Sequence, residues 1–182
     1  MDASSAGRGW YDWKYSVIAS NGGRIDLSGL NTVLGNERTE WLRFRPETNG
    51  TIDLSNVSRT SGRVYYDPEV PFFSLPALQS ASSAWFQVSP LNTIDLPALE
   101  NLNGCTLDIE DDGTINAPSL TAFANSSVTL KPNRFLLIPP LSEIDNSRIY
   151  LQDGAVFDRV SDSEYHWTNN WGNCLPPLSV IS

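Results

Sequence analysis

The sequence is poor in the residues on which many enzymes and metal sites depend. It holds one histidine, His166, and two cysteines among 182 residues. A single imidazole leaves little material for a histidine-based zinc site or a Ser-His-Asp triad. Two cysteines are too few for a disulfide scaffold, so we expect a packed apolar core to hold the fold.

Positive charge and long apolar runs are scarce as well. Lys and Arg number 12 against 21 Asp and Glu, which gives a net charge of −9. Such a surface repels nucleic-acid phosphates and anionic lipids, so we expect no nucleic-acid partner. No stretch approaches the roughly 18 apolar residues that cross a bilayer, so we expect no membrane insertion. The first seven residues lack the features of a signal peptide. We therefore expect a chain made without one or, preferably, part of a longer protein.

A short pattern returns along the chain: an apolar residue, a polar one, another apolar one, Ser or Pro, and after one more residue Leu or Val. Hydrophobic residues make up 40% of the chain, enough for the core of one domain. From Ile52 onward the copies are 21 residues apart, and they begin at Ile25, Ile52, Phe73, Ile94, Ile115 and Leu136. A unit of this length cannot bury its own apolar face, so the repeats must stack on one another.

A second motif, apolar-polar-apolar, runs in phase with the first and begins at Leu42, Val64, Phe86, Leu107, Val128 and Ile149. Alternation with period two is typical of strands, and Gly, Pro, Asn and Ser fill the gaps as turn residues. The sequence therefore predicts an all-β fold, a single-stranded parallel β-helix (β-solenoid) of six to seven coils. Its prolines at 76, 97, 118 and 139 should share one corner.

Aromatic residues gather at both ends of the repeat region. Trp10 and Trp13 precede it, and Trp167 and Trp171 follow it. Bulky rings suit the cover of a terminal coil, which otherwise exposes an apolar cross-section. We expect an N-terminal aromatic cap at 1–15, the parallel β-helix at 16–160 and a C-terminal cap or tail at 161–182.

The runs Ile25–Leu30 (IDLSGL), Ile52–Val57 (IDLSNV) and Ile94–Leu99 (IDLPAL) resemble repeats of very large secreted or surface proteins of planctomycete-like bacteria. The likeness covers about residues 16–160, and later coils depart from it by placing Pro after the Asp-Leu pair. It implies a right-handed parallel β-helix segment of an extracellular or cell-surface protein. It supplies no catalytic residues.

The second motif predicts an outward-facing surface, because residues on either side of inward apolar positions point to solvent. It gives two columns, one of Trp41, Arg63, Trp85, Thr106, Ser127 and Arg148, the other of Arg43, Tyr65, Gln87, Asp108, Thr129 and Tyr150. Aromatic rings with Arg and Gln on a flat sheet suit a glycan or a cell-surface protein as partner. The alternative is an ordinary strand surface, since Trp and Tyr favour strands. The predicted ligand face comprises Trp41, Arg43, Arg63, Tyr65, Trp85, Gln87 and Tyr150.

Two further candidate sites come from a cluster of acidic residues and from the two cysteines. Asp108, Glu110, Asp111 and Asp112 form an acidic corner that is a weak candidate for Ca²⁺; otherwise we expect no cofactor. Cys105 shares the inward direction of Leu107, and a disulfide with Cys174 in the tail is one alternative to a buried free thiol.

The Asp column, formed by Asp26, Asp53, Asp95 and Asp158, could supply catalytic carboxylates in a carbohydrate-active β-helix enzyme, a polysaccharide lyase or hydrolase. Each of these residues precedes a Ser or Pro corner, where Asp commonly bonds to turn backbone. We therefore favour a non-enzymatic structural or adhesive module, with the enzyme as the alternative.

Overall fold

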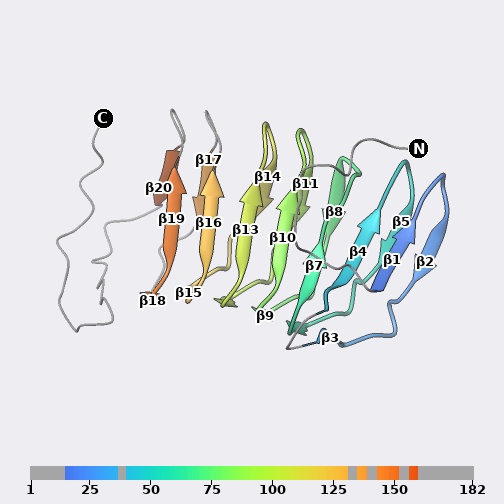
Figure 1. Cartoon of the computed structure of the whole chain (residues 1–182), viewed down its shortest axis with the longest axis horizontal. Coiled ribbons are helices and arrows are strands. Elements are labelled where there is room, and N and C mark those ends of the chain that lie inside the picture. The colour runs from blue at the N-terminus through green and yellow to red at the C-terminus, as the bar shows by residue number, and fades with distance from the viewer. Residues whose placement is uncertain (1–14, 37–39, 131–134, 139–142, 152–155, 160–182) are drawn as a thin grey trace.

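The computed structural model describes residues 15–36, 40–130, 135–138, 143–151 and 156–159. Within these ranges the chain forms parallel strands and no helix, and the strands stack side by side along one axis (Figure 1). Consequently the described part contains no helix with the length and apolar character needed to cross a bilayer. The predicted parallel β-solenoid is confirmed.

Three rows of strands build the solenoid. The first is a seven-stranded sheet of β1 (Tyr15–Ala19), β4 (Leu42–Pro46), β7 (Val64–Tyr66), β10 (Trp85–Val88), β13 (Thr106–Ile109), β16 (Ser127–Leu130) and β19 (Arg148–Leu151). The second row is interrupted and comprises β2 (Arg24–Asp26) with β5 (Thr51–Asp53), then β8 (Phe72–Ser74), β11 (Thr93–Asp95) and β14 (Thr114–Asn116), and finally β17 (Phe135–Ile138) with β20 (Val156–Arg159). These two rows correspond to the two sequence motifs.

The third row is a six-stranded sheet that neither motif predicts. It comprises β3 (Thr32–Leu34), β6 (Arg59–Ser61), β9 (Ser80–Ser82), β12 (Asn101–Asn103), β15 (Ala122–Ala124) and β18 (Glu143–Asp145). Its middle positions in the first five strands are Val33, Thr60, Ala81, Leu102 and Phe123, all buried. Each of these five strands sends one side chain inward, so they show no alternation to detect.

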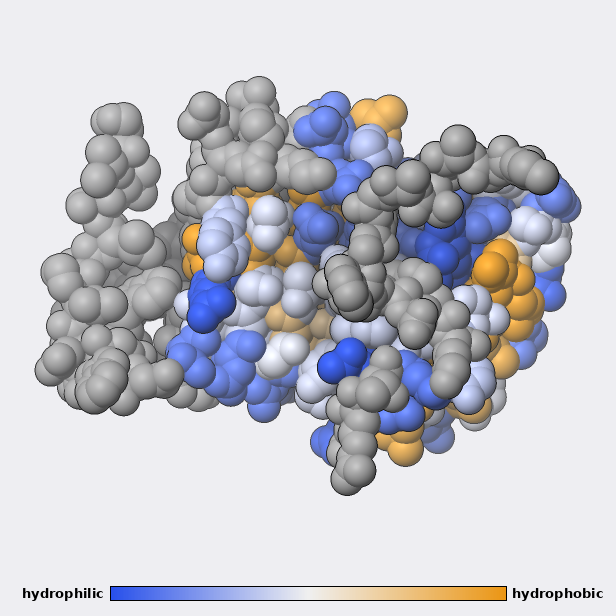
Figure 2. Space-filling model, in the orientation of Figure 1, coloured by the Kyte–Doolittle hydropathy of each residue, from blue (hydrophilic) through white to orange (hydrophobic). Residues whose placement is uncertain are grey.

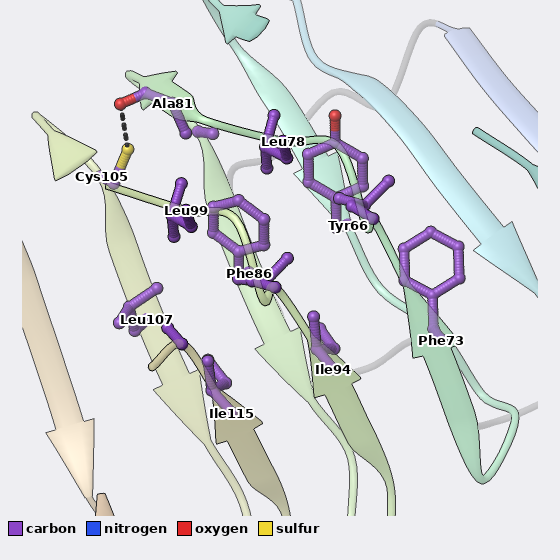
Figure 3. Close-up of a cluster of buried hydrophobic side chains, with 14 of the residues drawn as sticks. Tyr66, Phe73, Leu78, Ala81, Phe86, Ile94, Leu99, Cys105, Leu107 and Ile115 are labelled. Atoms are coloured by element: carbon purple, nitrogen blue, oxygen red, sulfur yellow. Dashed lines mark hydrogen bonds between the residues drawn. The ribbon is translucent and has the colours of Figure 1, made fainter. Parts of the chain in front are cut away.

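The core is a set of inward columns running along the solenoid (Figure 3). Phe44, Tyr66 and Phe86 stack with ring centroids 5.6 and 5.0 Å apart, and Leu107 follows Phe86 in register. Each such side chain contributes about 1.5–3 kcal/mol when it leaves water. Because every column crosses several coils, no coil is stable without its neighbours.

The Ser or Pro of the first motif lies in a tight turn. In three coils the backbone N–H of Leu78, Leu99 and Leu120 donates to the carbonyl three residues earlier at 3.1–3.2 Å. Proline suits the second position of such a turn because its φ is already correct and its missing N–H is not needed. The predicted proline corner is confirmed for the prolines at 76, 97 and 118, and the proline at 139 lies outside the described residues.

A second corner leads from the third row into the seven-stranded sheet. At this corner one residue per coil adopts a positive φ of 49–76°, and these residues, 21 apart, are Gly62, Ser83, Gly104, Asn125 and Asn146. Gly and Asn tolerate this left-handed conformation best. The Asn125 amide donates to Asn103 and the Asn146 amide to Asn125, both at 2.9 Å, so side chains link successive coils here.

The strand register corrects the predicted columns at one step. Tyr65 lies opposite Arg43 on one side and opposite Trp85 on the other, so Trp85 does not continue the column of Trp41 and Arg63. The column is Arg43, Tyr65, Trp85, Thr106, Ser127 and Arg148. The predicted register differs from the observed one by two residues, and an even difference leaves every side chain on its predicted face. Ring stacking of Phe44, Tyr66 and Phe86 selects the true register.

Candidate functional site

The structure brings six of the seven predicted ligand-face residues together on the outward side of β4, β7 and β10. The side chains of Trp41, Tyr65 and Trp85 pack with centroids 5.0–6.4 Å apart. The Arg43 guanidinium lies 5.7 Å from the Tyr65 ring and the Arg63 guanidinium 5.6 Å from the Trp41 ring. We call Trp41, Arg43, Arg63, Tyr65, Trp85 and Gln87 the aromatic cluster. The seventh residue, Tyr150, lies three strands further along the same sheet, on β19.

The cluster is not the flat platform that the sequence predicts. The sequence predicts Trp41 and Trp85 two coils apart on a flat sheet, with rings able to stack on alternate sugars of a glycan. Their centroids are 6.0 Å apart, and the rings meet edge to face at 67°. Edge-to-face rings stabilise each other, so these side chains use part of their surface on one another.

Burial also removes two residues from the predicted ligand face. Tyr65 is 1% exposed and Gln87 is 3% exposed. The Tyr65 hydroxyl donates to Gln87 Oε1, and Gln87 Nε2 donates to Glu110 Oε1 at 3.2 Å. The two residues face outward from the sheet as predicted, but they offer no surface to a ligand.

An ion-pair network that the sequence did not reveal adjoins the aromatic cluster. The carboxylate of Asp67, 4% exposed, accepts hydrogen bonds from Arg43 and Arg45. Arg45 also pairs with Glu47 and Glu69. Two guanidinium groups offset the cost of burying one carboxylate. Asp67 follows β7 in an irregular stretch, so no strand pattern identifies it.

The four acids of the predicted calcium corner lie along the end of β13 and in the turn that follows it. Asp108 faces outward from β13, Glu110 accepts the bond from Gln87, and Asp111 and Asp112 form a turn in which Asp112 has a φ of 57°. In the described part of the chain, no three Asp, Glu, His or Cys side chains converge in a way that could hold a metal ion. The Gly113 N–H closes this turn on the Glu110 carbonyl at 2.8 Å.

Two members of the Asp column, Asp26 and Asp53, bond to their own corners as expected, and Asp95 bonds to a neighbouring coil. Asp26 accepts from the Ser28 N–H and hydroxyl at 3.0 and 2.6 Å, and these bonds lower the pKa of its carboxyl. Asp53 accepts from the N–H two residues on at 3.1 Å. Asp95 accepts from Asn116 of the next coil at 2.6 Å. The side chain of the fourth member, residue 158, lies outside the described part.

Cys105 is a buried free thiol. It is 1% exposed and donates to the Ala81 carbonyl at 3.4 Å (Figure 3). Burial raises the pKa of the thiol to about 11, so it is protonated at neutral pH and unreactive. Its proposed disulfide partner, Cys174, lies outside the described residues, as does His166.

Comparisons of the chain with models of protein families, with curated proteins and with solved structures each gave no match.

Proposed function

We propose that this chain is a non-enzymatic structural or adhesive module of an extracellular or cell-surface protein, built as a right-handed solenoid of six to seven coils. The observation that supports the proposal is that outward polar side chains are used to bond one coil to the next. Arg24 reaches Asp53 at 3.0 Å, Asn116 reaches Asp95, and Asn146 reaches Asn125.

These bonds favour a structural role over catalysis. A catalytic carboxylate in a lyase or hydrolase must be able to accept or donate a proton at the scissile bond. Asp26 and Asp53 instead accept from the corner backbone of their own coils, and Asp95 accepts from a neighbouring strand. Such ladders stiffen a rod whose stability is the sum of repeat and interface terms.

A rod of this kind suits a protein that projects from a cell or links to a second surface. The partner that we propose is a glycan or a cell-surface protein, bound outside the core. Because Tyr65 and Gln87 are buried, contact at the aromatic cluster would fall on the partly exposed Trp41, Arg63 and Trp85. Weak single contacts on such a module gain strength by repetition along a surface.

Surface labelling of intact native cells tests the location. An antibody raised against the folded chain should label cells before permeabilisation, and protease added outside the cells should remove that signal. Labelling that requires permeabilisation would contradict the proposal.

A polysaccharide panel tests the absence of catalysis. Acidic and neutral polysaccharides incubated with the purified chain should yield no new reducing ends and no unsaturated products. Turnover that disappears in Asp26→Asn, Asp53→Asn or Asp95→Asn would overturn the non-enzymatic proposal in favour of a carbohydrate-active enzyme.

A further inference from the structure

A polar groove crosses three strands at the far end of the seven-stranded sheet from the aromatic cluster. It lies where the left-handed corner meets β13, β16 and β19, and its volume is about 380 Å³. The described residues that line it are Gly104, Cys105, Thr106, Asn125, Ser126, Ser127, Asn146 and Arg148. This size lies within the range of small-molecule sites, about 300–1,000 Å³.

The groove exists because the outward column changes from large side chains to small ones. Arg43, Tyr65 and Trp85 fill the column over β4, β7 and β10, whereas Thr106 and Ser127 continue it over β13 and β16. The hydroxyls of Thr106 and Ser127 lie 3.4 Å apart. Figure 2 shows hydrophilic and intermediate residues over this part of the sheet, with hydrophobic residues visible between them. Among the described residues, the floor therefore presents hydroxyl groups, and the outward column over β13 and β16 carries no bulky side chain.

The charge of the groove is opposite to that of the chain. The protein carries a net charge of −9, yet none of the eight lining residues is acidic and one, Arg148, is a cation. Arg148 is exposed on β19. A guanidinium at the end of a polar groove favours a carboxylate, which it can bind through two parallel hydrogen bonds.

An aromatic residue outside the groove lining lies on the same face of β19 as this cation. Tyr150 follows Arg148 by two residues in β19, so both side chains point to the same face, about 6.6 Å apart along the strand. The Tyr150 side chain is 52% exposed. An exposed ring beside hydroxyls, amides and a guanidinium is a set of groups suited to a sugar.

We propose that this groove binds an acidic sugar, a uronate unit of a polysaccharide. Arg148 binds its carboxylate, Thr106 and Ser127 bond to its hydroxyls, and Tyr150 packs against its ring. The exposed amides of Asn125 and Asn146 line the corner side. This inference names a ligand for the proposed adhesive role, and its biological meaning rests on that proposed function. The binding itself can be tested on the purified chain alone.

Calorimetric titration of the purified chain with trigalacturonate tests the groove, with neutral maltotriose as the comparison ligand. Wild type should bind trigalacturonate at least tenfold more tightly than maltotriose. Arg148→Gln should weaken trigalacturonate binding tenfold or more, and Tyr150→Ala should weaken it several-fold. Ser127→Tyr should abolish binding, because it fills the groove with a residue that a strand accepts.

Arg59→Gln is the matched control, since Arg59 is an exposed cation on β6 of another sheet. It should bind as wild type does, and all variants should keep the wild-type thermal midpoint. Absence of trigalacturonate binding, equal binding of maltotriose, or wild-type affinity in Arg148→Gln and Ser127→Tyr would overturn the proposal. Groove binding by a chain that intracellular labelling places inside cells would overturn only the proposed location, so the two failures are distinguishable.

Discussion

The two ends of the seven-stranded sheet share one backbone arrangement and present opposite outer surfaces. Over β4, β7 and β10 the outward side chains are large and bonded to one another, and Tyr65 is 1% exposed. Over β13, β16 and β19 they are small or solvent-directed, and Tyr150 is 52% exposed. The inward columns continue through both regions without a break. The core and the outer face of a solenoid are thus set independently, and each can be altered without the other.

The largest effect should come from the core that both regions share. Leu96 is fully buried at the corner after β11. Leu96→Asp would place a charge without a partner in the stack, and we expect the loss of about 4 kcal/mol or more and unfolding of the domain. Circular dichroism during heating measures this. Leu91→Asp is the control, because Leu91 is 74% exposed; equal melting of the two variants would contradict the assigned core.

A smaller loss should follow from Asp67→Asn in the aromatic-cluster half. The change leaves Arg43 and Arg45, whose side chains are 15% and 23% exposed, without their shared anion. Breaking a fully buried pair costs about 3–5 kcal/mol, and the partial exposure of both arginines reduces our expectation to about 2 kcal/mol. Urea denaturation gives the value. Glu100→Gln, at an exposed carboxylate, should change nothing, and a matching loss there would refute a specific network.

The most direct contrast between the halves is a pair of identical substitutions. Tyr65→Phe removes the hydroxyl that donates to buried Gln87, which should cost about 1 kcal/mol. Tyr150→Phe removes a hydroxyl from an exposed ring and should leave the unfolding free energy unchanged. Parallel urea melts compare the two. Equal unfolding free energies for the two variants would mean that the difference in burial between the halves does not affect stability.

The smallest effect concerns the dependence of stability on acidic pH. Bonds from Ser28 lower the pKa of the Asp26 carboxyl below its ordinary value of 3.8. A pKa lowered in the folded state stabilises the fold above the unfolded value, and that contribution disappears as pH falls through the folded pKa. In Ser28→Ala the pKa of Asp26 should rise towards its ordinary value, as carboxyl NMR titration would show. An unchanged pKa would mean that Ser28 does not set it.

The core could be predicted from sequence because strand alternation and a 21-residue period report the inward positions directly. Ile94 and Ile115 illustrate this, since both occupy predicted inward positions and both are buried. The third row escaped prediction because one inward residue per strand, as different as Thr60 and Phe123, leaves no periodic signal. The two-residue error in the predicted register at Tyr65 has a related cause, because an even shift leaves the alternation of inward and outward residues unchanged.

The candidate site was harder to foresee than the core. The sequence identified which residues would gather on the outward face, but their burial depends on contacts that strand patterns do not encode. Asp67 lies after a strand in an irregular stretch. The groove at Ser127 exists because the neighbouring outward side chains are small, which no motif records. A signal for the left-handed corner was present in the 21-residue recurrence of Gly, Ser and Asn from Gly62 to Asn146.

Because the later coils keep a regular register, the length of this solenoid can change in steps of one whole coil. From Trp85 to Arg148 every strand of the seven-stranded sheet pairs with a residue 21 positions away, and the left-handed corner keeps the same step. Removing or duplicating a segment of 21 residues rejoins each column to a matching one, whereas the loss of a single residue turns inward side chains outward. Natural variation in this part of the chain is therefore expected to come in whole coils, which lengthens or shortens the rod without redesigning its interior.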